Sequence, residues 1–203
     1  SSDLPMVDSL NHGSNAVVSK LANPKVDLQS NEVHSVRGLV LGYVQSGKTA
    51  NYSAVISKAI DSGYKFIIVL AGIHNNLRLQ TEKRLRAEIV NPSEFKADPV
   101  TKMDEDGDFN DKLASSANRV LGSKDGFGIA VLKKNSSVLR KFNRWLEEAN
   151  DDVKTKTPVL IIDDESDQAS VNTAKDPKKE QTAINGHIRK IIDKFKIVSY
   201  VGY

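Results

Sequence analysis

The chain has 203 residues, of which 39% are hydrophobic and 27% charged, proportions that are ordinary for a soluble globular protein. Its 29 basic and 26 acidic residues leave a net charge of +3, too small to argue by itself for nucleic-acid binding. The sequence shows no apolar run near the roughly 20 residues of a membrane span, no secretory signal and no cysteine, so disulfides and thiolate metal sites are excluded and a cytoplasmic location is expected.

Five short apolar runs of strand length follow a polar lead-in at residues 1–36, where only a weak helical pattern precedes Asn23-Pro24. The runs occupy residues 38–42, 66–70, 127–132, 159–163 and 197–201. None of them alternates polar and apolar residues, which indicates strands covered on both faces. Helical patterns separate them, at residues 55–60, 76–87, 138–146 and 184–195. This alternation predicts an α/β fold with one five-stranded, mainly parallel sheet and helices on both faces.

The length suits one domain, which we place at residues 37–203. Residues 91–125 lack clear periodicity and are expected to form an irregular insertion. Within it, the acidic stretch at residues 104–108 invites a calcium-loop interpretation. That alignment puts Lys102 and Leu113 where such a loop needs carboxylates, so a solvated surface loop is the better prediction.

The first apolar run leads straight into the phosphate-binding pattern G-x-x-x-x-G-K-[ST], a P-loop or Walker A motif. The residues expected to hold the phosphates are Gly42, Gln45, Ser46, Gly47, Lys48 and Thr49. Small residues let backbone N–H groups turn inward, and the helix that follows adds the positive end of its dipole. Lys48 would reach the β- and γ-phosphates, and the Thr49 hydroxyl would bind Mg²⁺. The sequence therefore predicts a protein that binds a nucleoside triphosphate, with Tyr43 and Tyr52 as packing residues nearby.

The fourth apolar run ends in Asp163-Asp164-Glu165-Ser166-Asp167, which fits a Walker B element of the D-E-x-D form. Under this interpretation Asp164 holds the metal ion and Glu165 polarises the attacking water, and both are catalytic together with Lys48. Asp163 competes for the metal role, because it also ends the apolar run. The carboxylates could instead cap the next helix. A glutamate at this place favours hydrolysis of the nucleotide over the phosphoryl transfer of a small-molecule kinase.

Three segments resemble the Z-one domain family, whose bacterial and phage members are described as endonucleases. They read GYVQSGKTAN at residues 42–51, LAGIHNNLR at residues 70–78 and IDDESDQAS at residues 162–170. The resemblance extends over residues 37–203. It implies the first RecA-like motor domain of a superfamily 2 helicase, a P-loop ATPase that uses ATP and Mg²⁺ and acts on DNA.

The resemblance also implies partners. In that family a segment like residues 199–203 continues into Thr-Ala-Thr-Pro, which couples nucleotide state to nucleic acid in related helicases, and a second RecA-like domain supplies an arginine finger. This chain by itself is therefore expected to be nearly inactive. MORC-type ATPases and nucleases are further partners that the resemblance implies. The sequence has no P-D…E-x-K or histidine-rich nuclease pattern, so we expect any cleavage to reside elsewhere.

The favoured function is the N-terminal ATP-binding and hydrolysing domain of a DNA translocase or helicase in restriction or phage defence. The alternative is an ATP-gated scaffold that changes partners without motor activity on DNA. A small-molecule kinase is a weaker possibility, because it needs a mobile lid with phosphate-binding arginines and the acidic insertion is a poor one.

Residues 71–86 follow the second apolar run, at the sheet edge where related helicases contact the phosphate backbone. Asn75 and Asn76 could cap the next helix and offer its N–H groups to a phosphate. Positive charge comes from Arg78, Lys83, Arg84 and Arg86, and from Lys133 and Lys134 after the third run. The alternative is a solvated helix face whose charges are balanced by Glu82 and Glu88. His74 is predicted to be structural.

Overall fold

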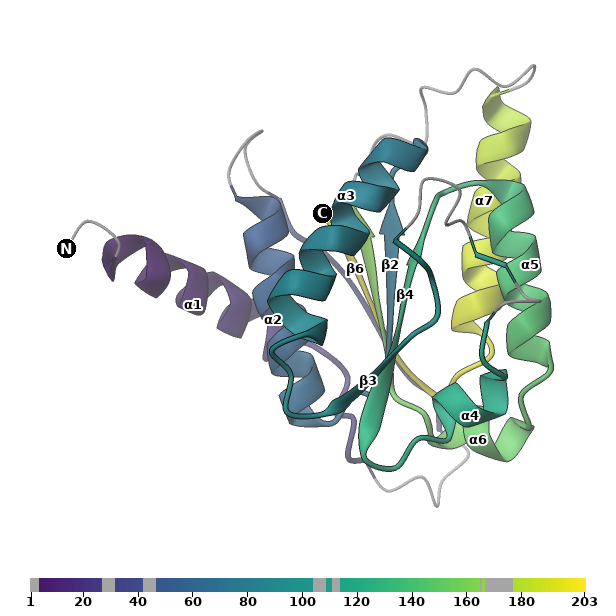
Figure 1. The fold of residues 1–203 in the computed structure, drawn as a ribbon, viewed down its shortest axis with the longest axis horizontal. Helices are drawn as coiled ribbons and strands as arrows, with labels where there is room; N and C mark the ends of the chain where they lie inside the picture. The colour runs from purple at the N-terminus through teal and green to yellow at the C-terminus, as the bar shows by residue number, and fades with distance from the viewer. Residues whose placement is uncertain are drawn as a thin grey trace.

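Six parallel strands form one sheet, and helices cover both of its faces (Figure 1). The computed structural model describes residues 4–26, 32–41, 47–103, 109–110, 114–164, 166 and 177–203. Several predicted features lie outside the described residues: Gly42, Tyr43, Gln45, Ser46, Glu165, Asp167 and the acidic stretch at residues 104–108. Their roles therefore stay predictions from the sequence.

The strands follow the apolar runs closely. Their bounds are His34–Leu39 (β1), Phe66–Ala71 (β2), Lys96–Pro99 (β3), Gly126–Leu132 (β4), Val159–Asp164 (β5) and Ile197–Gly202 (β6). All residues of β2 and β4 are buried, which agrees with their continuous apolar sequences. β1 begins four residues before the predicted run at 38–42, because its six residues pair with the six residues of β6, from His34 beside Ile197 to Leu39 beside Gly202.

The sheet has the strand order β1-β6-β5-β2-β4-β3, and every pair is parallel. The prediction that the strand at 197–201 lies between the first strand and the Asp164 strand is confirmed. The predicted count of five strands is wrong. The sixth strand, β3, lies within the expected irregular insertion and pairs only with β4, which tolerates its polar sequence and its proline at the sheet edge.

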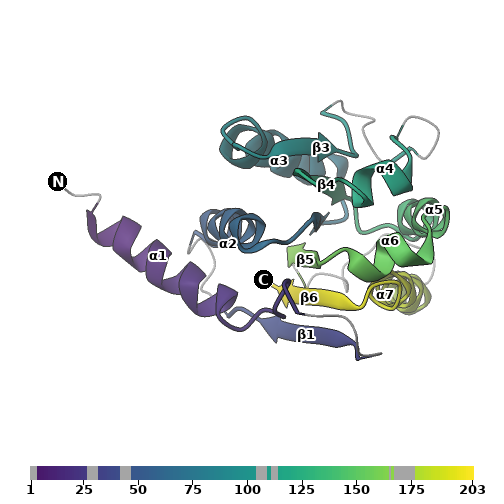
Figure 2. The same ribbon diagram turned by 90° about the horizontal axis from the view of Figure 1, so that it is seen from below.

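The helices form two layers on opposite sides of the sheet (Figure 2). One layer contains α1 (Leu4–Val18), α2 (Lys48–Ser62) and α3 (Asn75–Leu85), which continues into the π-helical turn η1 (Arg86–Val90). The other layer contains α4 (Ala117–Leu121), α5 (Ser136–Glu147), α6 (Asp151–Lys156) and α7 (Pro177–Ile192). Gly63 ends α2 with a positive φ of 118°, in the left-handed region that favours glycine, and its N–H bonds the carbonyl of Ala59.

The two layers enclose two apolar clusters, one on each face of the sheet. On the α5–α7 face, Trp145 packs with Phe66, Phe109 and Phe142 at ring-centroid distances of 5.5–6.1 Å. On the α2 face, alternate residues of the strands meet α2 and η1. Alternation along β5 sends Val159 and Ile161 to the α5–α7 face and Leu160 and Ile162 to the α2 face. The same alternation decides where the acidic residues at the end of β5 lie.

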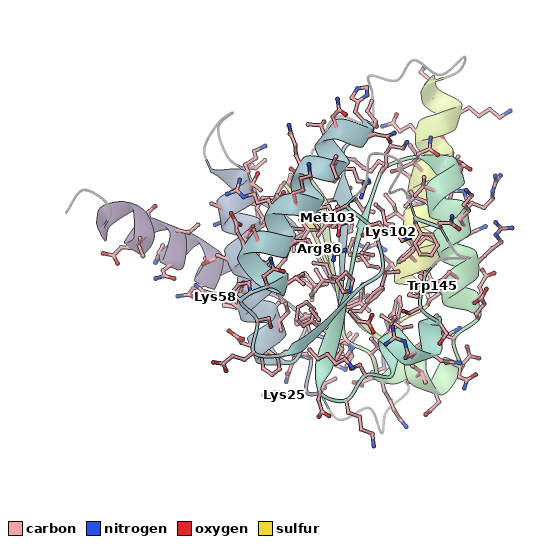
Figure 3. The ribbon with its side chains drawn as sticks, viewed as in Figure 1. Lys25, Lys58, Arg86, Lys102, Met103 and Trp145 are labelled. Carbon is pink, nitrogen blue, oxygen red and sulfur yellow. The ribbon has the colours of Figure 1, made fainter. Side chains whose placement is uncertain are left out.

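The segment after α1 is fastened to the sheet by a buried group of polar atoms. The Tyr64 hydroxyl donates to the carbonyl of Ala22 at 2.7 Å and lies 2.8 Å from Ser199 Oγ, which accepts from the Ala22 N–H at 2.8 Å. Burial raises the pKa of Tyr64 to about 12, and the bond from Ser199 partly opposes that shift. Lys58 on α2 also donates to Ser14 and Asn15 on α1, both at 2.7 Å (Figure 3).

Candidate functional site

The predicted phosphate-binding helix begins where the motif places it. Gly47 is its N-terminal cap residue, with φ 73° and ψ 25°, and α2 starts at Lys48. The positive φ suits glycine, because a Cβ in this left-handed conformation would be strained. Gly47 is exposed, and Lys48 and Thr49 are half-buried. The first turn of α2 therefore combines its N–H groups and dipole with an accessible lysine and hydroxyl, the combination that binds phosphate elsewhere.

The two aspartates at the end of β5 point to opposite faces of the sheet. Asp163 continues the series of Val159 and Ile161, on the face covered by α5 and α7. Asp164 continues the series of Leu160 and Ile162, on the face covered by α2. Only Asp164 thus shares a side of the sheet with the first turn of α2. Of the two aspartates that compete for the predicted metal role, strand geometry therefore places Asp164 on the side of α2 and Asp163 on the opposite side.

A buried tyrosine joins the two predicted metal ligands. The Tyr52 hydroxyl, one turn into α2, donates to Asp164 Oδ2 at 3.3 Å, and the side chains of Thr49 and Thr81 act on the pKa of the same phenol by lowering it. Burial and, after it, the negative charge of Asp164 raise the pKa of Tyr52 well above its ordinary value. The phenol is therefore a permanent neutral donor at neutral pH. Thr49 and Asp164, 115 positions apart in the sequence, both act on the pKa of this phenol.

These donors fit a magnesium ion by their chemistry. Mg²⁺ takes oxygen ligands, and it is commonly held by a hydroxyl, one or two carboxylates, waters and the phosphates of a nucleotide. Thr49 supplies the hydroxyl and Asp164 a half-buried carboxylate. Both lie on the side of the sheet that carries the predicted phosphate-binding turn, so among the described residues these are the two side chains that would hold the ion.

Asp163 is occupied by internal partners instead. Its Oδ1 accepts from Lys134 Nζ at 2.9 Å, and its Oδ2 accepts a short hydrogen bond from the Tyr200 hydroxyl of β6. Burial and then the charge of Asp163 raise the pKa of Tyr200, so this phenol also stays protonated. Asp163 is 5% exposed and Lys134 is 4% exposed. The prediction of Lys134 as a surface contact for nucleic acid is corrected: its ammonium lies inside the protein.

The chain after β5 returns to the end of β6. Ser166 donates from its N–H and its Oγ to the carbonyl of Tyr203, at 3.1 and 3.2 Å, while the Tyr203 N–H donates to the carbonyl of Asp163 at 2.9 Å. The ring of Tyr203 meets Tyr52 edge-on at 5.5 Å between centroids, and its hydroxyl donates to Asn51 Oδ1 at 2.9 Å. Tyr203, the residue directly after β6, is thereby in contact with both α2 and the segment that carries the predicted Walker B acids.

The start of α3 holds part of the predicted nucleic-acid contact. His74 occupies the N-terminal cap position without a side-chain cap bond, so the expected capping role of Asn75 and Asn76 is corrected. All three residues are exposed. Lys133 Nζ donates to Asn75 Oδ1 at 2.7 Å, which brings together two predicted contact residues 58 positions apart. Asn75, Asn76 and Lys133 thus gather at the first turn of an 11-residue helix.

Arg78 is in the interior, which corrects its assignment to the exposed contact surface. Its side chain is fully buried, lies 3.6 Å from Glu82 Oε2 and donates to the carbonyl of Lys102 at 3.1 Å. Glu82, 2% exposed, also accepts from Arg86 Nε at 2.8 Å and from the Thr101 hydroxyl at 2.6 Å. Arg86 also donates to the carbonyl of Thr101 at 2.6 Å, and both Arg86 and Lys102 are labelled in Figure 3. These contacts tie α3 to the segment after β3.

The sequence reasoning missed the joining role of Tyr52, the pair formed by Lys134 and Asp163, and the contact of Tyr200 with that pair. The spacing of Tyr52 on α2, one turn after Thr49, was visible. The pairing of Lys134 with Asp163 had no local signal, because it depends on β2 separating β4 from β5 in the sheet.

No protein-family model matches the chain, and no curated protein is significantly similar to it in sequence. The resemblance to the Z-one family therefore stays a prediction from its three motifs. Among the residues that the structure describes, no helix is both long and apolar enough to cross a bilayer.

Proposed function

We propose that this chain is a RecA-like P-loop domain that binds Mg·ATP. One observation carries the proposal: Asp164, and not Asp163, lies on the α2 side of the sheet, where it accepts from the hydroxyl of Tyr52, one turn after Thr49 on α2. This is the juxtaposition that Walker A and Walker B elements need, because both must reach one metal ion. The position of β6 between β1 and β5 supports the same class, since P-loop enzymes that use a catalytic glutamate share this arrangement.

The proposed roles follow from the residue types. The loop of Gly42, Gln45 and Ser46 together with Gly47 would wrap the phosphates, and Lys48 would neutralise their charge. Thr49 and Asp164 would hold the metal ion, which when bound supplies charge stabilisation at the phosphates. Glu165, next to Asp164 in the sequence, would act as the base that polarises water.

At the level of the whole protein, we propose a motor domain of a DNA translocase or helicase in restriction or phage defence. The three motifs that resemble the Z-one family support it. The exposed Asn75 and Asn76, with the half-buried Lys133 that bonds Asn75, lie at the same end of the sheet and support a phosphate contact of the kind that positions a strand without reading its sequence.

A second candidate, the ATP-gated scaffold, is favoured by the ion pairs that the arginines of α3 and η1 form within the protein. Arg78 and Arg86 both pair with Glu82, and Arg84 pairs with Glu88 at 2.8 Å. A helix that neutralises these arginines internally offers less charge to DNA than its sequence indicates.

Phosphate release in the presence and absence of single-stranded and duplex DNA, measured on the longest natural form of the protein, separates the two candidates. Stimulation by DNA supports the motor, and ATP binding without stimulation supports the scaffold.

Calorimetric titration with ATP, with and without Mg²⁺, tests the class itself. The wild-type chain should bind ATP more tightly when Mg²⁺ is present, and Asp164→Asn should lose that gain because an amide oxygen is a poorer ligand. Asp193→Asn is the matched control, since Asp193 is an exposed carboxylate just before β6. A wild-type chain that binds no nucleotide, or an Asp164→Asn chain with unchanged dependence on Mg²⁺, would contradict the proposal.

A further inference from the structure

Lys134 is a buried cation that holds the two consecutive aspartates of β5 by different atoms. Its Nζ lies 2.9 Å from the carboxylate oxygen Oδ1 of Asp163 and 2.8 Å from the main-chain carbonyl oxygen of Asp164. Its own N–H donates to the carbonyl of Gly72, just after β2, at 2.8 Å. Lys134, the second residue after the end of β4, therefore reaches the ends of both β2 and β5.

A buried ammonium needs a specific reason to be retained. Removing the charge of a lysine from water costs several kcal/mol, and a single carboxylate partner often does no more than offset that cost. An apolar residue would fill the same space without this penalty. A lysine does something that an apolar residue cannot: its compact ammonium directs several hydrogen bonds in different directions from one point. Here two of those bonds fix the side chain of one aspartate and the backbone of the next.

The bond to Asp164 bears directly on the candidate metal ligand. The Asp164 side chain leaves β5 toward α2, while its carbonyl is held from the other side by Lys134. The backbone of Asp164 is thus fixed at the last residue of the strand, where the ladder of strand hydrogen bonds ends. Fixing this residue fixes the direction in which its carboxylate points, which is how outer groups orient a ligand in known metal sites.

We propose that Lys134 is a positioning residue for Asp164, one that sets the affinity of the site for Mg²⁺ without touching the ion. The inference rests on the proposed function, because it assumes that Asp164 is the metal ligand. It predicts that the loss of Lys134 changes the contribution of Mg²⁺ to nucleotide binding and leaves the binding of metal-free nucleotide unchanged. A lysine that only stabilised the fold would change neither quantity selectively.

The test compares variants that disturb Asp163 in different ways. Lys134→Met alone leaves Asp163 buried without its cation, which would destabilise the fold. The double variant Lys134→Met/Asp163→Asn removes both charges and should therefore still fold. Tyr200→Phe is the matched control, since it removes the other side-chain partner of Asp163 but leaves the bond from Lys134 to the Asp164 carbonyl in place. Urea unfolding establishes that each variant is folded, and calorimetry then measures ATP affinity with and without Mg²⁺.

We expect the double variant to lose about 10-fold or more of the affinity gained from Mg²⁺, the typical effect of removing an outer-shell partner, with unchanged affinity for metal-free ATP. Tyr200→Phe should keep the wild-type gain. A folded double variant with the wild-type gain would overturn the role of Lys134 and leave the proposed function standing. A wild-type chain that gains nothing from Mg²⁺ would overturn the proposed function, and the inference with it.

Discussion

The helices α2 and α3 start at the same end of the sheet, yet their charged and polar residues differ in burial and in the partners that they bind. At α2, the half-buried Asp164 carboxylate accepts from the neutral phenol of Tyr52, and Thr49 is half-buried one turn earlier on the helix. At α3, Glu82 binds both Arg78 and Arg86 by i,i+4 pairs inside the protein. The first turn of α2 thus keeps Lys48 and Thr49 partly exposed, whereas Arg78 and Arg86 bind the segment after β3. Basic residues counted along a helix therefore say little about a binding surface until their partners are known.

The largest expected effect concerns the α3 side of this comparison. Glu82→Ala should lower the free energy of unfolding by about 3–5 kcal/mol, because it leaves the buried Arg78 without its carboxylate partner. Urea unfolding followed by circular dichroism measures the change. Glu88→Ala is the matched control on the continuing helical turn, where the glutamate side chain is 40% exposed, and it should cost less than about 1 kcal/mol. Equal losses in the two variants would show that Glu82 is not a structural centre.

Much of the fold could be predicted from the sequence, because buried parallel strands are continuous apolar runs. β2, β4 and β5 differ from the predicted runs by a residue at one end. The start of β1 was predicted too late in the chain, because Leu39 and Leu41 have the apolar side chains typical of the core of a strand. In the structure these two residues are 63% and 86% exposed. β3 could not be predicted, since Lys96–Pro99 has no apolar pattern and pairs only through its backbone with β4.

The candidate site could be predicted only in part. The type and spacing of Lys48 and Thr49 are local properties, so the motif indicated where α2 begins. The choice between Asp163 and Asp164 depends on which face of β5 is covered by α2, and no local sequence pattern contains that information. The spacing of Arg78 from Glu82 was equally visible, but the burial of the pair depends on the segment near Thr101 folding over it.

The second effect is expected on the α2 side. Lys48→Ala should weaken Mg·ATP binding by about 10- to 100-fold, since a hydrogen bond to a charged group contributes about 1.5–3 kcal/mol. Glu165→Gln should keep the affinity and lower the rate of phosphate release, because the amide keeps the shape and loses the charge that polarises water. Calorimetry and a phosphate-release assay measure the two quantities. An equal loss of binding in both variants would contradict the division of roles between these residues.

A smaller effect is expected at the phenol that contacts Asp164, the proposed metal ligand. Tyr52→Phe should lower the free energy of unfolding by about 1 kcal/mol, because the hydroxyl that donates to Asp164 is removed from a buried position. Thermal unfolding with and without Mg·ATP measures the change and its dependence on ligand. Tyr64→Phe is the control, since it removes a buried phenol hydroxyl that contacts Ala22 and Ser199 and not Asp164. Only Tyr52→Phe should alter the stabilisation by Mg·ATP, and a change of the same size in Tyr64→Phe would count against the role of Tyr52.

The smallest effect tests whether the exposed arginine of α3 is held by its ion pair as firmly as the buried arginine is. Arg84 and Glu88 are 41% and 40% exposed and lie 2.8 Å apart, so water screens their attraction. A double-mutant cycle with Arg84→Ala and Glu88→Ala should give a coupling energy of about 0.3–0.5 kcal/mol in urea unfolding, falling as salt is added. So weak a pair is easily exchanged for a phosphate, and Glu88→Ala should then strengthen binding of single-stranded DNA at low salt if α3 belongs to a motor surface. A coupling energy above about 1 kcal/mol would mean that Arg84 is committed to the fold as firmly as Arg78, and that α3 has little charge left to offer.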